Sequence, residues 1–240
     1  MNDSHFALLI DAENVSNKYI QLIFDELSKM CVITYKRIYG DWTRSAMTSW
    51  KAVLLKHSLT PIQQYSYTSG KNSTDSSLII DAMDILYTGK VEGFCIVSSD
   101  SDFTRLASRL RESGMYVIGM GEKKAPEPFI TACNEFKHLD VISSSKEHPE
   151  AKNNSHTAVT PIGAVSKALL SIAADISDED GWSALSEVGN VISKRMPDFD
   201  VRNYGVGKLS SLIFSLGLFD VKSVRKNGLR VMYIRKKRNG

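Results

Sequence analysis

Along the first half of the chain, short runs of apolar residues alternate with longer segments in which apolar residues recur every three or four positions. Continuous apolar runs of this length are typical of strands buried on both faces, whereas the longer period indicates amphipathic helices. The runs that predict strands are residues 6–10, 32–39, 61–65, 94–98 and 116–120. The segments that predict helices are residues 18–30, 44–56, 75–86 and 102–112. This alternation predicts an α/β fold with a parallel sheet covered by helices.

The pattern changes after Ile142, where residues 143–160 are polar and show no repeating face, which is typical of a linker. The segments beyond it predict three helices, at residues 161–174, 185–196 and 207–216, and two strands, at 219–224 and 229–234, joined by a Lys-Asn-Gly turn. Three helices and a hairpin predict a winged helix. We therefore expect domains at residues 1–142 and 161–236, joined by a linker at 143–160.

The composition of the 240 residues, 42% hydrophobic and 24% charged, excludes a wholly disordered chain. No apolar run approaches the roughly 18 to 20 residues that cross a bilayer, and the N-terminus does not resemble a signal peptide. We expect a cytoplasmic protein with no membrane partner.

The three cysteines form no CxxC pair, and their odd number and apolar surroundings predict buried, reduced thiols. The five histidines show no zinc-ligand spacing either. Any metal in this protein would therefore be held by oxygen.

Charge is distributed unevenly. Residues 1–145 carry 15 Lys and Arg against 17 Asp and Glu, whereas residues 146–240 carry 15 against 10. Within the second half, residues 201–240 contain 10 basic residues and a single acid, Asp220. Such a surface suits a polyanionic partner, although a merely solvated basic tail would have the same composition.

Carboxylates follow several of the predicted strands. Ligands of open parallel sheets collect at the carboxyl ends of the strands, so these residues are expected to lie along one edge. They are Asp11 and Glu13, with Asn14 beside them, after the first strand; Asp75 after the third; and Asp100 and Asp102 after the fourth. Because crowded like charges repel, such a cluster requires compensation, which Mg²⁺ or Mn²⁺ would supply through oxygen ligands.

Helix capping offers an alternative role for Asp75 and Asp102, which stand at the start of helical segments, but not for Asp11 and Asp100. Along the predicted helix, Asp81 lies about 240° from Asp75 and Asp84 about 180°, so one helix cannot aim all three at one ion. We select Asp75 as the ligand. Asp81 remains a candidate either to position the metal ligands or to stabilise the fold.

Three motifs carry a resemblance to NYN domains, which are PIN-like nucleases: Ile-Asp-Ala-Glu-Asn at residues 10–14, Lys-Asn-Ser-Thr-Asp-Ser-Ser-Leu-Ile-Ile-Asp at 71–81 and Val-Ser-Ser-Asp-Ser-Asp-Phe at 97–103. The resemblance extends over about residues 5–142 and includes the segment at 133–139. It implies ribonuclease activity, with Mg²⁺ or Mn²⁺ on Asp11, Asp75, Asp100 and Asp102, assistance from Asn14, and 5′-phosphate and 3′-hydroxyl products. Thr74 departs from the family pattern, which has an apolar residue there.

The second half resembles OST-HTH/LOTUS domains through the segments at residues 182–189 and 197–209. Those domains are winged helices associated with RNA or with protein partners. Trp182, Phe199 and Tyr204 are candidates to stack on bases, but aromatic side chains in so small a domain more often form its core.

Basic residues of both domains are candidates to contact RNA phosphates, although each could equally be solvated surface. In the first domain they are Lys71, Arg105, Arg109, Lys123 and Lys124. In the second domain they are Arg202, Lys208, Lys222, Arg225, Lys226 and Arg230.

Our working hypothesis is a metal-dependent ribonuclease acting on single-stranded RNA. Asp11, Asp75 and Asp100 would anchor one cation, Asp102 would position a second cation or the attacking water, and Asn14 would orient the scissile phosphate. The main alternative is an adaptor with little or no catalysis that recruits RNA or a protein through its winged helix. A haloacid-dehalogenase-like phosphatase is disfavoured, because Glu13 stands where that class needs a second aspartate. Homodimerisation is left open.

Overall fold

The computed structural model describes residues 4–65, 73–147, 160–226 and 229–237, and the chain divides into two compact units, residues 1–143 and 144–240. The first unit is built on a six-stranded sheet in the order β3-β2-β1-β4-β5-β6, in which every neighbouring pair is parallel. The predicted α/β class is thus confirmed. The strands are β1 (His5–Asp11), β2 (Val32–Gly40), β3 (Thr60–Gln63), β4 (Gly93–Val97), β5 (Tyr116–Gly121) and β6 (Glu135–His138).

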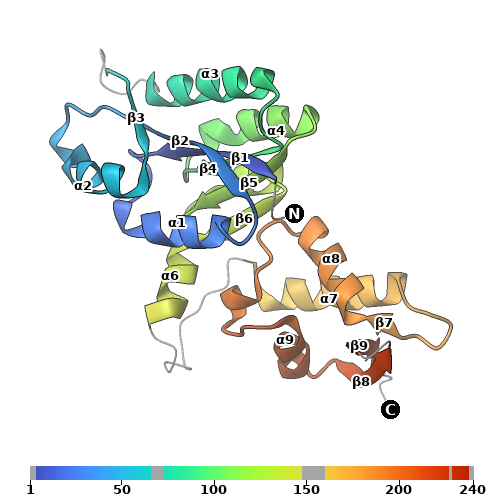
Figure 1. The fold of residues 1–240 in the computed structure, drawn as a ribbon. Coiled ribbons are helices and arrows are strands. Elements are labelled where there is room, and N and C mark those ends of the chain that lie inside the picture. The colour runs from blue at the N-terminus through green and yellow to red at the C-terminus, as the bar shows by residue number, and fades with distance from the viewer. Residues whose placement is uncertain (1–3, 66–72, 148–159, 227–228, 238–240) are drawn as a thin grey trace. The chain divides into compact units, whose positions relative to one another are not determined.

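Helices cover both faces of this sheet (Figure 1). Alternate residues of β1 divide between two cores: Leu8 and Ile10 pack with α1, α2 and α6, whereas Ala7 and Leu9 pack with α3, α4 and α5. All four side chains are fully buried, which explains why the strand reads as one continuous apolar run. The helices are α1 (Ile20–Leu27), α2 (Thr48–His57), α3 (Ser73–Thr88), α4 (Thr104–Glu112), α5 (Glu127–Ala132) and α6 (Leu139–Glu147).

Short 3₁₀ turns open three of these helices, so the helical segments expected at residues 18–30, 44–56 and 102–112 each split in two. The turns are η1 (Asn17–Tyr19), η2 (Ser45–Met47) and η3 (Ser101–Phe103).

The strand β6 is not predicted by the sequence pattern, because Lys137 and His138 interrupt the apolar run that such a strand would show. Both are buried, and Lys137 forms ion pairs with Glu26 and Glu135, at 3.5 and 2.8 Å. The helix α6 also reaches Glu147, within the segment expected to be a linker.

The second unit has the winged-helix arrangement that the sequence predicts. Its helices are α7 (Ile162–Asp175), α8 (Leu185–Arg195) and α9 (Leu209–Leu216), and a 3₁₀ turn, η4 (Val201–Tyr204), precedes α9. Its sheet has the order β7-β9-β8 and is antiparallel, with β8 (Phe219–Lys226) and β9 (Leu229–Lys236) as the hairpin. The two-residue strand β7 (Ser183–Ala184) was not predicted. The turn residues 227 and 228 lie outside the described residues.

The core of the second unit is formed where the helices meet one face of this small sheet. Val165, Leu169 and Ile172 of α7 pack with Val188 of α8 and Ile234 of β9. Helix α9 contains no charged residue, and its Phe214 side chain is 62% exposed.

The three cysteines, Cys31, Cys95 and Cys133, are free thiols buried in the first unit, as expected. Across the parts of the chain that the structure describes, no helix is both long enough and apolar enough to span a bilayer.

Candidate functional site

Asp11 ends β1 and is 1% exposed. Its carboxylate accepts four hydrogen bonds. Oδ1 accepts from the backbone N–H groups of Glu13 and Asn14, at 3.0 and 3.3 Å, and Oδ2 accepts from Asn14 Nδ2 at 2.7 Å and Ser98 Oγ at 2.8 Å. Burial raises the pKa of Asp11, although all four bonds act to lower it. A carboxylate offers about four acceptor positions, so protein donors already fill those of Asp11.

Asp100 and Asp102 lie at the carboxyl end of β4, beside Asp11. The hydroxyl of Ser98 joins the two strands, because it donates to Asp11 and accepts from the backbone N–H of Asp100 at 3.1 Å. Asp100 caps the turn η3 by accepting from the N–H of Asp102 at 3.0 Å. The expectation that Asp100 has no capping role is therefore wrong: the chain turns into a helix directly after the strand, and the first carboxylate becomes its N-cap.

Asp75 lies in the first turn of α3 and is 9% exposed. Its desolvation by burial, together with the negative charges of four other acids, raises its pKa to about 6. Those acids are Asp11, Asp100, Asp102 and Glu13. Carboxylates from three separate segments are thus close enough to make a further negative charge on Asp75 unfavourable.

The donor set consists of carboxylate oxygens, which is the chemistry that Mg²⁺ and Mn²⁺ prefer. In this respect the residues fit a divalent cation. The arrangement is not preassembled, however: no group of three or more His, Cys, Asp or Glu side chains in the described part of the chain stands ready to hold a metal ion. The filled acceptor positions of Asp11 give one physical reason.

Asp81 has a structural environment of its own. One of its oxygens forms an ion pair with Arg37, and the other accepts a hydrogen bond from the Tyr39 hydroxyl. Both partners come from β2, so Asp81 ties α3 to the sheet. Burial and the bond to Asp81 raise the pKa of Tyr39 and keep its hydroxyl protonated.

The sequence analysis did not identify a further group of polar side chains, which follows β2 at the carboxyl edge of the sheet. Glu13 Oε1 accepts from the backbone N–H of Asp41 at 3.4 Å and lies 3.7 Å from Arg44 Nη1. Asp41 is 7% exposed, and its Oδ1 accepts from the Thr43 hydroxyl at 2.6 Å and from Gln63 Nε2 at 3.0 Å. The signal was present in the sequence, because Asp41 and Arg44 follow the second strand just as Asp11 follows the first.

The candidate phosphate-binding residues of the first unit stand at the surface. Arg105, Arg109, Lys123 and Lys124 are exposed. Two of them have acidic partners: Arg109 lies 3.9 Å from Glu112, and Lys124 lies 3.0 Å from Glu122. Lys71 lies outside the described residues.

In the second unit the predicted cations differ in their surroundings. Lys208, Arg225 and Arg230 are exposed, whereas Lys222 is half-buried. Arg202 forms an ion pair with Asp200 at 2.6 Å. The side chain of Lys226 lies outside the described residues.

The three aromatic candidates of this unit separate into two groups. Phe199 and Tyr204 pack against the core, as the alternative interpretation holds. Trp182 does not belong to that core, and its ring instead lies against Lys222 and Arg235.

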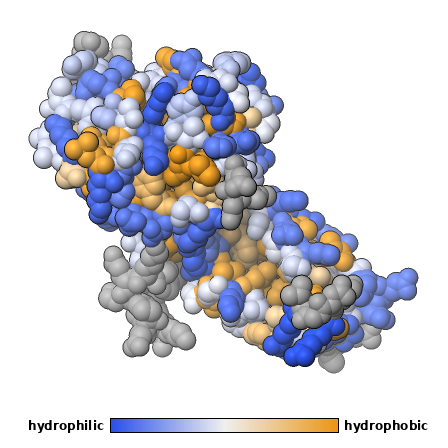
Figure 2. Space-filling view, in the orientation of Figure 1, coloured by the Kyte–Doolittle hydropathy of each residue, from blue (hydrophilic) through white to orange (hydrophobic). Residues whose placement is uncertain are grey.

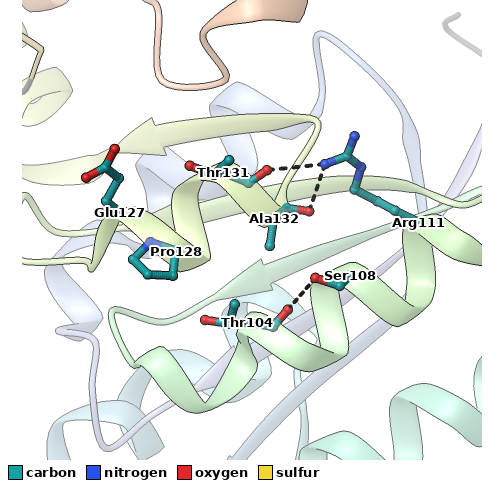
Figure 3. Close-up of a pocket in the computed structure, with 7 residues that line it drawn as sticks. All are labelled: Thr104, Ser108, Arg111, Glu127, Pro128, Thr131 and Ala132. Carbon is teal, nitrogen blue, oxygen red and sulfur yellow. Dashed lines mark hydrogen bonds between the residues drawn. The ribbon is translucent and has the colours of Figure 1, made fainter.

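A pocket of about 510 Å³ between α4 and α5 contains none of the predicted site residues (Figure 3). Its cation, Arg111, donates to the backbone oxygens of Thr131, Ala132 and Cys133, at 3.2, 3.2 and 3.4 Å. Arg111 therefore caps the carboxyl end of α5, and Glu127 on the opposite wall would repel a phosphate. This pocket lies where α4 and α5 pack together, and it is not the candidate site.

The solved structures similar to this chain include two proteins without an assigned function. The first is a crystal structure of a protein from Vibrio parahaemolyticus, 17% identical, covering 55% of this chain and 91% of its own, with a TM-score of 0.47. The second is a solution NMR structure of a protein from Nitrosomonas europaea, 32% identical, covering 38% of this chain and 87% of its own, with a TM-score of 0.32. A search of curated proteins gives no match.

Two family models match the chain in the order that the motifs predict. Residues 161–231 match the OST-HTH/LOTUS domain, whose members bind RNA. Residues 5–140 match the NYN domain, a PIN-like nuclease family. The stretch matched by NYN contains Asp11, Asp75, Asp100 and Asp102. The chain therefore belongs to the NYN domain family and carries an OST-HTH/LOTUS domain after it.

Proposed function

We propose that this protein is a divalent-metal-dependent ribonuclease that hydrolyses RNA phosphodiester bonds at the carboxyl edge of its six-stranded sheet. One observation carries the proposal: burial, together with the charges of four acids from two other segments, raises the pKa of Asp75 to about 6. A chain that needed only stability would gain nothing from this repulsion. A cation placed among the acids would remove it.

Asp11, Asp75, Asp100 and Asp102 would hold Mg²⁺ or Mn²⁺. When bound, such an ion supplies charge stabilisation at the scissile phosphate and lowers the pKa of a coordinated water. The protein's own part is to fix the positions of these acids through Ser98 and the η3 turn and to orient the RNA. Products with 5′-phosphate and 3′-hydroxyl ends belong to this proposal.

Asn14 has two roles in succession. Its amide donates to Asp11 Oδ2, where it occupies a position that a cation would need. Of the four donors on Asp11, two are backbone groups and one is the buried Ser98, so the half-exposed Asn14 side chain is the one free to rotate. Once turned away from Asp11, the same amide becomes available to orient the scissile phosphate.

We further propose that the second domain holds single-stranded RNA for this site in the cytoplasm. The charge balance of the chain supports this division: the net charge is −2 (15 − 17) for residues 1–145 and +5 (15 − 10) for residues 146–240.

The decisive experiment uses the full chain with 5′-labelled and 3′-labelled single-stranded RNA in Mn²⁺, Mg²⁺ or EDTA. We expect cleavage with either ion, none in EDTA, and a loss of at least about 100-fold for Asp100→Asn. Asp84→Asn is the matched control, because Asp84 is an exposed acid on α3. Cleavage that persists in EDTA or in Asp100→Asn would refute the mechanism.

One observation favours a second candidate function, that of an RNA-binding or protein-recruiting adaptor. The acids are not preassembled as a metal site, and Asp11 is saturated by protein donors. An adaptor would bind RNA with the same affinity in Mn²⁺ and in EDTA and would leave the RNA intact in both, so the same assay separates the two functions.

A further inference from the structure

The outward face of the second unit's sheet carries a cluster of aromatic and basic side chains that packs against nothing in the core. Register places Lys222 opposite Tyr233 and Asp220 opposite Arg235, so these four side chains share one face. The other face holds Val221 and Ile234, which pack into the core. Trp182 directly precedes the buried Ser183 of β7, which puts its ring on the outward face.

Trp182 is the centre of this cluster. Lys222 Nζ lies 4.1 Å from the centroid of its ring and Arg235 Cζ lies 4.5 Å from it, and Lys222 also lies 5.7 Å from the ring centroid of Tyr233. All three distances are within the range of cation–π attraction. Two flexible cations from different strands are thereby fixed beside one aromatic ring.

Acids lie on one side of the cluster, beside Arg235. Asp220 is 3.3 Å from Arg235, and Glu179 and Asp180 line a pocket together with Arg235 and Lys236. Two cations held against one ring repel each other, and an anion placed between them would relieve that repulsion. Figure 2 shows hydrophilic side chains over part of the end of this unit where β8 and β9 lie. Lys236 and Lys237 of that end are exposed.

We propose that the outward face of β8 and β9 is a binding site for the backbone of single-stranded RNA, with Lys222 and Arg235 as its phosphate contacts and Trp182 as the residue that positions them. Because the ring holds both cations in place before RNA arrives, less side-chain freedom is lost on binding. The site rests on the proposed RNA-binding role of this domain and adds Arg235 and Trp182 to it. The helix α9, by contrast, has no charged side chain to offer a phosphate.

The test measures the affinity of the full chain for a fluorescent single-stranded RNA in EDTA, where a metal-dependent nuclease cannot cleave it, over a range of salt concentrations. Lys222→Gln and Arg235→Gln are each expected to weaken binding about three- to tenfold and to reduce the salt slope by about 0.7, the loss of one phosphate contact on a single strand. Lys194→Gln, an exposed lysine on α8, is the charge-matched control and is expected to bind like the wild type. Slopes for Lys222→Gln and Arg235→Gln equal to that of Lys194→Gln would overturn the proposal.

The positioning role of Trp182 has its own readout. Trp182→Leu is expected to weaken binding several-fold and Trp182→Phe to restore most of it, because phenylalanine keeps a ring for the cations. In a chain that already carries Lys222→Gln and Arg235→Gln, Trp182→Leu should have no further effect. An equal loss in that background would mean that the ring contacts RNA directly, and a change in melting temperature without a change in RNA affinity would mean a purely structural role; either result overturns the positioning role.

This experiment separates the site from the nuclease proposal. A chain that binds RNA through this face but cleaves nothing refutes the nuclease and leaves the site intact. A chain that cleaves RNA in Mn²⁺ while Lys222→Gln and Arg235→Gln bind like the wild type refutes the site and leaves the nuclease intact.

Discussion

The side-chain amide of Asn14 lies 2.7 Å from Oδ2 of Asp11 and donates a hydrogen bond to it. This bond fills one of the acceptor positions that a cation would use, so the amide and the cation compete for the same oxygen. In the proposed nuclease, metal binding and phosphate orientation would therefore be coupled through one rotatable side chain.

Replacing Asn14 should separate these two effects. Asn14→Ala removes the competing donor, so we expect Mn²⁺ to bind several-fold more tightly in titration calorimetry without RNA. Cleavage at saturating Mn²⁺ should nevertheless fall about tenfold or more, because the scissile phosphate loses an orienting group. Asn17→Ala is the control, since the amide of Asn17 donates to the Ser49 carbonyl instead. Weaker Mn²⁺ binding by Asn14→Ala would contradict the competition.

The pKa of Asp75 predicts the pH dependence of cleavage. A folded-state pKa of about 6 means that Asp75 is protonated below pH 6 and loses its value as a cation ligand there. We expect kcat/KM to rise with pH through about 6 and the midpoint to move to lower pH as Mn²⁺ is increased, because the cation competes with the proton. A midpoint that stayed fixed over a wide range of Mn²⁺ would argue against Asp75 as a ligand.

The raised pKa of Asp75 also predicts that the protein without metal is less stable at neutral pH than it would be without this carboxylate. The folded pKa of about 6 exceeds the ordinary value of 3.8, so the folded state holds the proton more tightly, and the free energy of unfolding falls as pH rises through that window. Asp75→Asn should therefore stabilise the protein at pH 7.5 in EDTA by about 1 kcal/mol, once solvent screening is allowed for, or roughly 2–4 °C in melting temperature. Mn²⁺ should raise the melting temperature of the wild type but not that of Asp75→Asn.

Asp81 should behave as a structural residue. Asp81→Ala leaves the Arg37 charge and the Tyr39 hydroxyl without their acceptor, and we expect a loss of about 2 kcal/mol in the free energy of unfolding by urea denaturation. The Mn²⁺ concentration at half-maximal cleavage should stay the same. A selective rise in that concentration, with stability retained, would instead place Asp81 in support of the metal ligands.

Arg44 is expected to contact substrate. It is exposed and lies 3.7 Å from Glu13, one of the acids whose charge acts on Asp75, so it presents a cation at the rim of the acidic cluster. Arg44→Ala should raise KM for RNA about three- to tenfold with little change in kcat, and Arg44→Lys should recover part of it. Lys51→Ala, which removes an exposed cation from α2, is the control. A fall in kcat alone would contradict a binding role.

Sequence periodicity was sufficient for the strands and helices whose buried faces are purely apolar, as in β1 and β4. It failed for β6, where the buried Lys137 forms ion pairs with Glu135 of the same strand and with Glu26 of α1. The pair with Glu26 joins segments far apart in the chain, so it cannot be recognised from the neighbours of Lys137 in the sequence.

The candidate site shows the same limit. The sequence shows that Asp11 and Asp100 stand at the ends of strands, and the family match adds the nuclease class. Three of the four donors to Asp11 are local, because they come from Glu13 and Asn14 of the same motif. The bond from Ser98 to Asp11 and the approach of Arg44 to Glu13 are tertiary contacts and carry no motif of their own.

The charge-free helix α9 limits the kind of nucleic acid that the winged helix can read. In many winged helices the corresponding helix enters the major groove of a duplex, and its polar side chains contact base edges. Here the most exposed large side chain of that helix is Phe214, which offers no hydrogen bond to a base edge, and its exposed polar side chains are the short serines Ser211 and Ser215. We therefore expect few base-specific contacts from this helix, so that discrimination between ligands would fall mainly to the shape and flexibility of the bound strand.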